Sequence, residues 1–372
     1  MTSGPPRQDS IESLLAGHQV VICLGPGGVG KTTTSAAFAV AAAMAGRRVV
    51  VLTIDPARRL ADAMGLGAGL DNEPQLVDGP WSQAKSGSNA QSGGGQLWAA
   101  MLDANAAFAS VIEQHAATAE QAASITNNRL FKNLTSSLSG TQEYMATERL
   151  RDLYLDDRFD LVIVDTPPSR HALDFLDSPA RLVRFIDHPL YRSVLAPRRG
   201  LMKMVNVAAQ LVIRTIGRVV GAELLTDVVD FFAAFDGLDE GFRARADEVD
   251  RLLASEHTAY VLVSAPRPGS TTGTRWIASE LTTRSLHISA LIANRLTPQA
   301  FAGTHRLDEA RPLDQNLAEL GQLARHEGEV ISQLVDDLGT PMTVRIDDQM
   351  VPISSLSALT DLAAQLVAAD QP

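Results

Sequence analysis

The stretch Gly25-Pro26-Gly27-Gly28-Val29-Gly30-Lys31-Thr32-Thr33 decides the fold of this chain. It follows an apolar run at 20–24 and precedes an alanine-rich run at 34–45, so the expected order is strand, glycine loop and helix. Its spacing matches the G-x-x-x-x-G-K-[ST] pattern of phosphate-binding loops. The alternative is a glycine-rich turn that binds nothing, which the flanking strand and helix disfavour.

The chemistry of this loop rests largely on its backbone. Glycines allow several N–H groups to converge on phosphate oxygens, and the following helix adds partial positive charge at its N-terminus. Lys31 is expected to reach the β- and γ-phosphates, and the Thr32 hydroxyl is expected to ligate Mg²⁺. The predicted nucleotide-binding residues are Gly27, Gly28, Val29, Gly30, Lys31, Thr32 and Thr33.

Buried strands alternate with helical stretches along most of the chain. Strands are predicted at 48–53, 97–102, 159–165, 259–264, 287–293 and 342–346. The run at 48–53 is β-branched and nearly continuous, as parallel strands are. This alternation predicts an α/β fold with a doubly wound, mostly parallel sheet in a single domain spanning 1–372. Residues 178–255 contain no convincing strand, so we expect a helical insertion subdomain there, joined by part of 104–150.

Composition and charge exclude several classes of protein. The formal net charge of −11 disfavours general nucleic-acid binding, although a local basic patch is compatible with it. Cys23 is the only cysteine, so the chain can form neither an internal disulfide nor a cysteine-based zinc site. Its place in the strand before the loop predicts a small buried side chain. Residues 1–10 are polar and lack a signal-peptide core, and we expect a cytoplasmic protein.

Two aspartates end predicted strands, and both are expected at the sheet edge that carries the loop. Asp165 ends the run at 161–164, where phosphate-loop proteins place the acid of the Mg²⁺ site. Asp55 follows the strand at 48–53 and is placed to orient or deprotonate an attacking water. The alternatives are a helix cap or turn for Asp165 and a turn before Pro56 for Asp55.

Together these segments resemble the arsenite-pump ATPase (ArsA) and tail-anchored-protein-targeting ATPase family. That family has a glycine loop of form G-K-G-G-V-G-K-T-T, a switch I of form T-D-P-A-H and a switch II of form D-T-A-P-T-G-H. This chain has the loop at 25–33, Thr53-Ile54-Asp55-Pro56-Ala57, and Asp165-Thr166-Pro167-Pro168-Ser169-Arg170-His171. The order and spacing of the three motifs agree over nearly the whole chain.

The resemblance implies an ATPase that uses ATP and Mg²⁺. It implies that Asp55 and Lys31 are catalytic, that Thr32 and Asp165 form the metal site, and that Asn294 contacts adenine. The alternative for Asn294 is a turn residue at a strand end. The resemblance also implies a dimer that ATP closes, with a helical subdomain that binds a protein or hydrophobic cargo.

Pro26 departs from the family pattern, which has a lysine there that reaches the neighbouring subunit's phosphates. Proline carries no charge and no N–H. One hypothesis is that this chain forms a heterodimer with a lysine-bearing relative, and that alone it hydrolyses ATP slowly. The alternative is that another cation compensates. With one cysteine, the chain also lacks the thiols that bind arsenite and the C-x-x-C pairs that hold zinc between subunits in the family.

The predicted insertion contains a basic, largely apolar stretch, Leu201–Gly221. No acid occurs between Asp187 and Glu223, a segment that carries six Lys or Arg residues. Three interpretations remain open: a core helix with a solvated basic stripe, a groove for a hydrophobic cargo helix, or contact with an anionic membrane or ligand. Arg214 and Arg218 argue against a membrane-spanning segment.

Three classes of function are alternatives to an active ATPase. The first is a non-catalytic subunit that binds nucleotide and gates its relative. The second is a partition-type ATPase that acts on membrane or DNA, which the long insertion disfavours. The third is a metabolic phosphoryl-transfer enzyme, for which the sequence shows no acceptor pocket.

Overall fold

The computed structural model describes residues 10–55, 59–67, 69–82, 94–128, 141–168, 170–187, 238–303, 312–339, 342–349 and 353–368. The chain divides into two compact units. The sheet unit comprises Met1–Leu102, Asp152–Leu173 and Ala254–Pro372, and the helical unit comprises Asp103–Arg151 and Asp174–Leu253. Residues 188–237, including the basic stretch at 201–221, lie outside the described residues.

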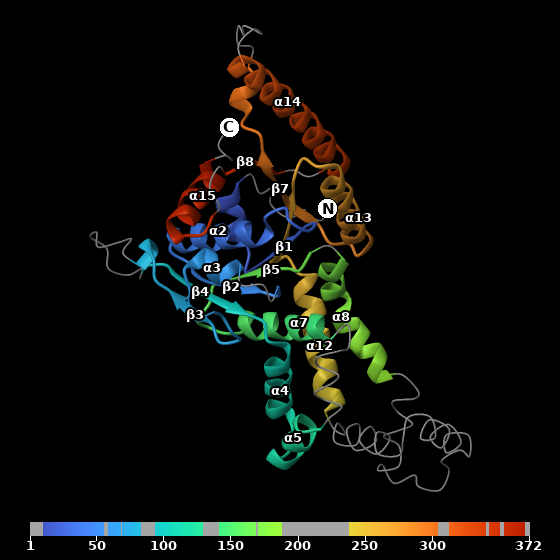
Figure 1. Ribbon diagram of the computed structural model, residues 1–372. Coiled ribbons are helices and arrows are strands. Elements are labelled where there is room, and N and C mark those ends of the chain that lie inside the picture. Colours follow the sequence, from blue (N-terminus) through green and yellow to red (C-terminus); the bar gives the residue numbers. More distant parts are fainter. Residues whose placement is uncertain are drawn as a thin grey trace, which may run out of the picture. The chain divides into compact units, whose positions relative to one another are not determined.

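The sheet unit is built on eight strands in the order β3-β4-β2-β5-β1-β6-β7-β8 (Figure 1). Every neighbouring pair is parallel except β3 and β4, which are antiparallel. This confirms the predicted α/β fold with a mostly parallel sheet. The strands are β1 (Val20–Leu24), β2 (Arg48–Thr53), β3 (Gln75–Val77), β4 (Gln96–Met101), β5 (Leu161–Asp165), β6 (Thr258–Ser264), β7 (Ile288–Leu296) and β8 (Thr343–Asp347).

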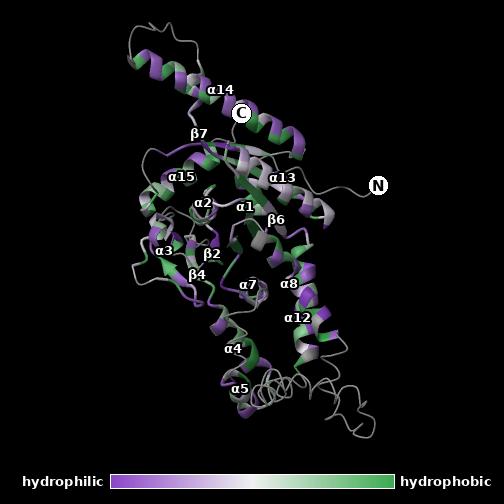
Figure 2. Ribbon diagram, turned by 45° about the vertical axis from the view of Figure 1, so that its right-hand side comes forward, coloured by the Kyte–Doolittle hydropathy of each residue, from purple (hydrophilic) through white to green (hydrophobic). Residues whose placement is uncertain are grey.

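Helices cover both faces of this sheet, as the continuous apolar strands require. One face packs on α1 (Ile11–Gly17), α2 (Lys31–Met44), α3 (Arg59–Met64) and α15 (Leu356–Ala368). The helices α13 (Pro268–Thr283) and α14 (Pro312–Leu338) contact β6 and β7, respectively. Figure 2 shows hydrophobic residues in the strands and mixed hydropathy along α14. Two short 3₁₀ helices, Pro80–Ser82 and Gln299–Ala302, lie in connections.

The strand order brings together, at the carboxyl ends of the strands, three segments that are distant in sequence. β5 lies between β1 and β2, so Asp165 is in register with Cys23 on one side and with Thr53 on the other. All three strands are parallel, and their carboxyl ends therefore meet. In open α/β sheets such an edge is where ligands bind.

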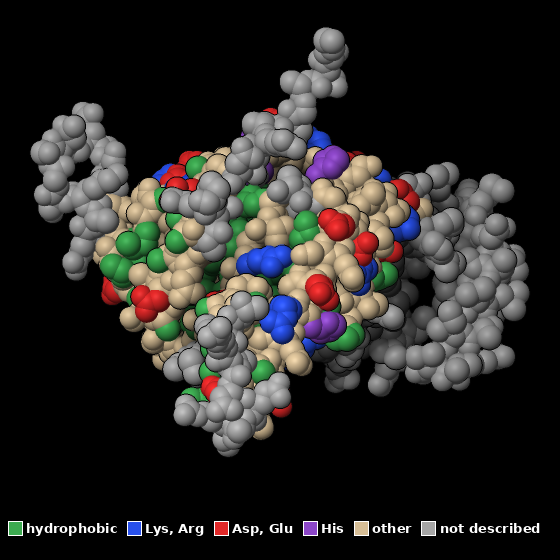
Figure 3. Space-filling model, turned by 90° about the horizontal axis from the view of Figure 1, so that it is seen from above, with side chains coloured by type: hydrophobic (Ala, Val, Ile, Leu, Met, Phe, Trp, Pro, Cys, Tyr) green, Lys and Arg blue, Asp and Glu red, His purple; other side chains and the backbone are tan. Residues whose placement is uncertain are grey.

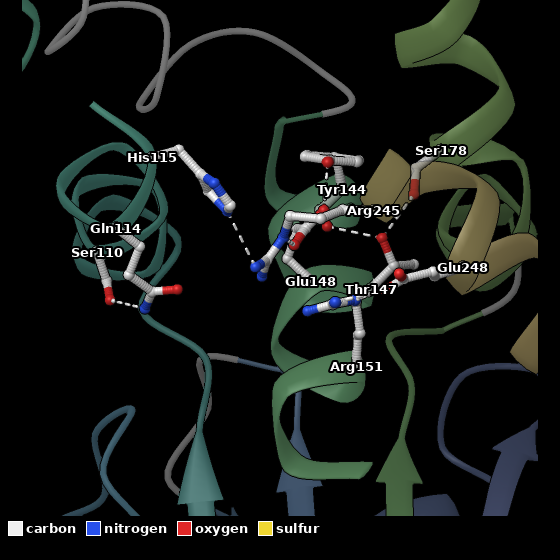
Figure 4. Close-up of polar contacts among 10 residues, drawn as sticks. All are labelled: Ser110, Gln114, His115, Tyr144, Thr147, Glu148, Arg151, Ser178, Arg245 and Glu248. Carbon is white, nitrogen blue, oxygen red and sulfur yellow. Dashed lines mark hydrogen bonds and ion pairs between the residues drawn. The ribbon is translucent and has the colours of Figure 1, made fainter. Parts of the chain in front are cut away.

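The helical unit contains α4 (Ala104–His115), α5 (Ala119–Thr126) and α12 (Asp239–Leu253), together with parts of α7 (Thr141–Tyr154) and α8 (Arg170–Asp187). It holds a buried polar network, drawn in Figure 4. The Glu148 carboxylate accepts from the Tyr144 hydroxyl and from Arg245 Nε. A second Arg245 nitrogen lies 3.2 Å from His115 Nε2. Because a guanidinium can only donate, the histidine nitrogen is the acceptor in this contact.

In the described residues, no helix has the length and apolar character needed to cross a membrane. On the face shown in Figure 3, basic and acidic side chains are interspersed, with hydrophobic patches between them.

Candidate functional site

The glycine loop joins β1 to α2 and begins against a neighbouring strand. A Cβ added to Gly25 would lie 2.3 Å from the carbonyl oxygen of Val263 in β6, so only glycine fits there. Gly28 and Gly30 adopt φ angles of +76° and +98°, a region that residues with a Cβ rarely enter. The sequence therefore folds this segment as the sharp turn that a phosphate-binding loop requires.

The loop ends at the N-terminus of α2. Gly30 is the residue before the helix, and no side chain caps the first N–H groups of α2. These donors are the ones that a phosphate group accepts from in such loops. The predicted residues Lys31, Thr32 and Thr33 form the first turn of this helix.

Lys31 is held inside the loop. Its side chain is buried, with 7% exposure, and Nζ donates to the carbonyl oxygen of Pro26 at 2.9 Å. Burial lowers the pKa of the Lys31 ammonium, while the nearby charges of Asp165 and Asp55 oppose that shift. The ammonium thus lies at the loop, near both acids that the sequence predicts.

Asp165 is the most constrained acid of the site. It is fully buried, and its Oδ2 accepts from the Thr32 hydroxyl at 2.7 Å and from the Thr53 hydroxyl at 3.0 Å. Among the residues that the structure describes, no hydrogen-bond partner faces its buried Oδ1. Burial raises the pKa of Asp165 to about 6, and the two hydroxyl donors and Lys31 counteract this shift.

The unpartnered carboxylate oxygen fits a metal site. A buried oxygen without a donor is costly, and a cation or its bound water would satisfy it. The Thr32 hydroxyl and the Asp165 carboxylate are hard oxygen ligands, the kind that Mg²⁺ prefers. Across the described part of the chain, no cluster of three or more His, Cys, Asp or Glu side chains offers another metal site.

Asp55 lies just beyond the end of β2, on the same edge. Its backbone N–H contacts the Thr53 hydroxyl at 3.3 Å, and its Oδ2 lies 3.7 Å from Arg59 Nη1. The Asp55 side chain is 21% exposed. It is therefore an accessible carboxylate near the buried Lys31 and Asp165, whose pKa values it influences.

The side chain of Asn294 also reaches the loop, where it contacts a backbone carbonyl. Its Nδ2 donates to the Val29 carbonyl at 2.8 Å, and its Oδ1 accepts from the backbone N–H of Arg295 at 2.9 Å. Arg295 has a φ of +61°, an uncommon conformation for a side-chain-bearing residue. A Cβ on Gly30 would lie 2.3 Å from Asn294 Nδ2, so the amide packs directly under the loop.

Sequence reasoning missed two residues of this site. Thr53 was named as a strand residue and as the first residue of the switch I stretch but was given no role in the site, although its hydroxyl donates to Asp165; its place two residues before Asp55 was the available signal. Gly273 was not singled out at all, yet a Cβ there would lie 2.8 Å from Pro26 Cγ. No local pattern marks that contact.

A parallel sheet with a glycine loop, a buried lysine and an aspartate at the adjoining strand end defines a phosphate-loop nucleoside triphosphatase fold. The sequence matches the anion-transporting ATPase family over residues 18–319, and the chain belongs to that family of ATP-binding ATPases. This confirms the resemblance drawn from the three motifs.

Individual relatives are similar at moderate identity. An uncharacterised protein of Streptomyces coelicolor is 30% identical over 281 residues, which cover 76% of this chain and 63% of that protein. The ATPase get3 of Schizosaccharomyces japonicus is 26% identical over 78% of this chain and 79% of its own length. The ATPase get3 of Aspergillus terreus is 28% identical over 48% of this chain and 50% of its own.

Proposed function

We propose that this chain binds ATP with Mg²⁺ and hydrolyses it, and that nucleotide-driven closure of a dimer controls a protein partner or cargo. Asp165 carries the proposal. Its buried carboxylate accepts from Thr32 and Thr53 through one oxygen, and no residue in the described part of the chain donates to the other. A purely structural aspartate is not expected to keep one buried oxygen unsatisfied.

Lys31 would neutralise charge on the phosphates. In the structure its ammonium donates to the Pro26 carbonyl, a neutral acceptor. Phosphate oxygens are charged acceptors and form stronger hydrogen bonds, so bound nucleotide would draw Nζ away from Pro26. Lys31 and the uncapped N–H groups of α2 then face the same anionic group.

The Thr32 hydroxyl and the Asp165 carboxylate are the groups that would hold Mg²⁺. When bound, Mg²⁺ neutralises negative charge on the β- and γ-phosphates. Thr53 keeps its hydrogen bond to Asp165 Oδ2 and so fixes the orientation of that carboxylate. Asp55 would accept a hydrogen bond from the attacking water and orient it toward the γ-phosphate.

Asn294 would contribute to binding the base. Its amide uses one N–H on the Val29 carbonyl, which leaves the second N–H to donate to a ring nitrogen of adenine.

The segment that runs from Asp165 into α8 supports coupling of this site to the helical unit. Asp165 is followed after four residues by α8, whose residues from Asp174 onward belong to the helical unit. A change in the segment after Asp165 on nucleotide binding would therefore be passed along one helix. The basic stretch at 201–221, for which a cargo groove is one of three interpretations, lies outside the described residues.

Steady-state ATP hydrolysis with Mg²⁺ tests the proposal on the native protein and Asp55→Asn. Asp62→Asn, on the exposed side of α3, is the matched control because it makes the same substitution away from the loop. Clear native turnover, lost in Asp55→Asn and kept in Asp62→Asn, would support it. Equal turnover in all three proteins would contradict the assigned role of Asp55.

Pro26 favours a second candidate, a nucleotide-binding subunit of a heterodimer with a lysine-bearing relative. The residue is buried within its own chain rather than exposed for contact with a neighbour. Native turnover near background that Pro26→Lys raises would support this candidate. Turnover as fast alone as in a mixture with a lysine-bearing relative would exclude it.

A further inference from the structure

The glycine loop is seated on α13 by a close contact that involves no hydrogen bond. Pro26 is buried, and the helix approaches it at Gly273. A Cβ added to Gly273 would lie 2.8 Å from Pro26 Cγ and 3.4 Å from Pro26 Cβ. Real Cβ atoms do not approach other atoms at the shorter of these distances, so any side chain at residue 273 would push the proline ring away.

Helix geometry does not call for a glycine at this position. Gly273 lies within α13 and does not have a positive φ, so alanine would be the better helix former there. Gly269 in the same helix shows the contrast, because a Cβ added to it would meet nothing within 4 Å. The space that Gly273 leaves is taken by the Pro26 ring.

The position of the Pro26 ring also fixes the carbonyl oxygen that accepts from Lys31. Proline has a nearly fixed φ, so the position of its ring determines the direction of the adjoining peptide groups. The Pro26 carbonyl accepts from Lys31 Nζ at 2.9 Å, and Gly27 follows directly in the predicted phosphate-binding set. Displacing the ring would move both the lysine acceptor and the start of that set.

We propose that Gly273 is a positioning residue for the nucleotide site: its missing side chain seats the Pro26 ring on α13, and this seat holds the loop Gly25–Lys31 in its phosphate-binding form. The side chain at residue 26, where the family pattern has a cross-dimer lysine, thus serves the loop of its own chain. This inference rests on the proposed binding of nucleotide at that loop.

The test is a double-mutant cycle on the full chain: native, Gly273→Ala, Pro26→Ala and the double variant. Affinity for Mg²⁺–ATP is measured by isothermal titration, and far-UV circular dichroism verifies folding. Gly273→Ala should weaken binding by about tenfold, the scale of overpacking at a close contact. Gly269→Ala makes the same change in the same helix, where space is open, and should bind as the native protein does.

The double variant decides the mechanism. Alanine at residue 26 removes the ring atom that Gly273→Ala would strike, so the alanine at 273 should have little effect in that background. A helix that is merely disturbed would lose affinity equally in both backgrounds, which would overturn the proposal. Native-like binding by Gly273→Ala would overturn it as well. If the native protein itself fails to bind Mg²⁺–ATP, the proposed function fails first, and this inference fails with it.

Discussion

Replacing Arg245 by methionine should destabilise the protein by about 3–5 kcal/mol, because it leaves a charge buried without its partner. The side chains of Arg245 and Glu148 are 8% and 1% exposed, and Arg245 Nε donates directly to the carboxylate. Methionine keeps an unbranched apolar stem and removes the guanidinium. Glu148 then retains the Tyr144 hydroxyl as its described partner.

Two losses make up this magnitude. The hydrogen bond to a charged group contributes about 1.5–3 kcal/mol, and the uncompensated carboxylate adds the cost of its desolvation. The contact of Arg245 with His115, 3.2 Å long, is lost at the same time. If the desolvation of the Glu148 carboxylate dominates the loss, the double variant Arg245→Met/Glu148→Leu should be more stable than Arg245→Met by about 2 kcal/mol or more.

Urea-induced unfolding, followed by far-UV circular dichroism at neutral pH, measures these differences. The matched control is Arg251→Met in the last turn of the same helix, where the arginine is exposed; it should stay within about 0.5 kcal/mol of native. A loss below about 1 kcal/mol for Arg245→Met would refute the reasoning. So would a double variant that is less stable than Arg245→Met.

Three other residues of the sheet unit are tested by separate predictions. Asp165→Asn should abolish the dependence of ATP affinity on Mg²⁺, measured by titration with and without the metal; an unchanged dependence would contradict the metal role. Asp160→Asn should cost less than about 1 kcal/mol, because its ion pair with Arg48 is partly exposed. The hydrogen bond from Arg48 holds the pKa of Asp160 in the folded protein below its usual value. The ion pair therefore adds to stability above the pKa of the unfolded chain, and this contribution is lost as the pH falls through the pKa of the folded protein. A stability difference between native and Asp160→Asn that stays constant in urea titrations at acid pH would refute this prediction. Burial raises the pKa of Cys23 to about 12, so a thiol reagent should label it only on unfolding, and rapid labelling of the folded protein would contradict its burial.

Much of the sheet follows from sequence because its central strands are buried on both faces. The run at 48–53 was predicted with the bounds that β2 has, and the remaining long strands differ from their predictions by at most three residues at an end. Burial on both faces requires such runs, and a continuous apolar run is visible locally. Cys23 was likewise expected in the core, and it is buried.

The short edge strand β3 and the start of α13 were not foreseen. The Gln75–Val77 segment has three residues and pairs antiparallel with β4, so its strand character comes from its neighbour. The α13 helix begins at Pro268, because proline is favoured in the first turn even when Gly, Ser and Thr follow.

Local sequence patterns also do not predict the order of the strands, or the partners that this order gives to each site residue. Sequence placed Asp165 and Asp55 at the ends of strands but could not show that β5 lies between β1 and β2. That order depends on tertiary pairing, and it explains why Thr53 holds Asp165. The Pro26–Gly273 contact depends on helix placement across many residues and has no signature in either segment.

The position of β5 also bears on how the chain is made. During synthesis β1 and β2 leave the ribosome first, yet they are not neighbours in the sheet, and the strand that joins them ends only at Asp165. Until then the inner edges of both strands lack their final partner. Such unpaired edges are open to wrong pairing. The glycine loop is therefore complete in sequence long before its supporting strands can assemble, and we expect the proposed nucleotide binding only after β5 has paired with both β1 and β2.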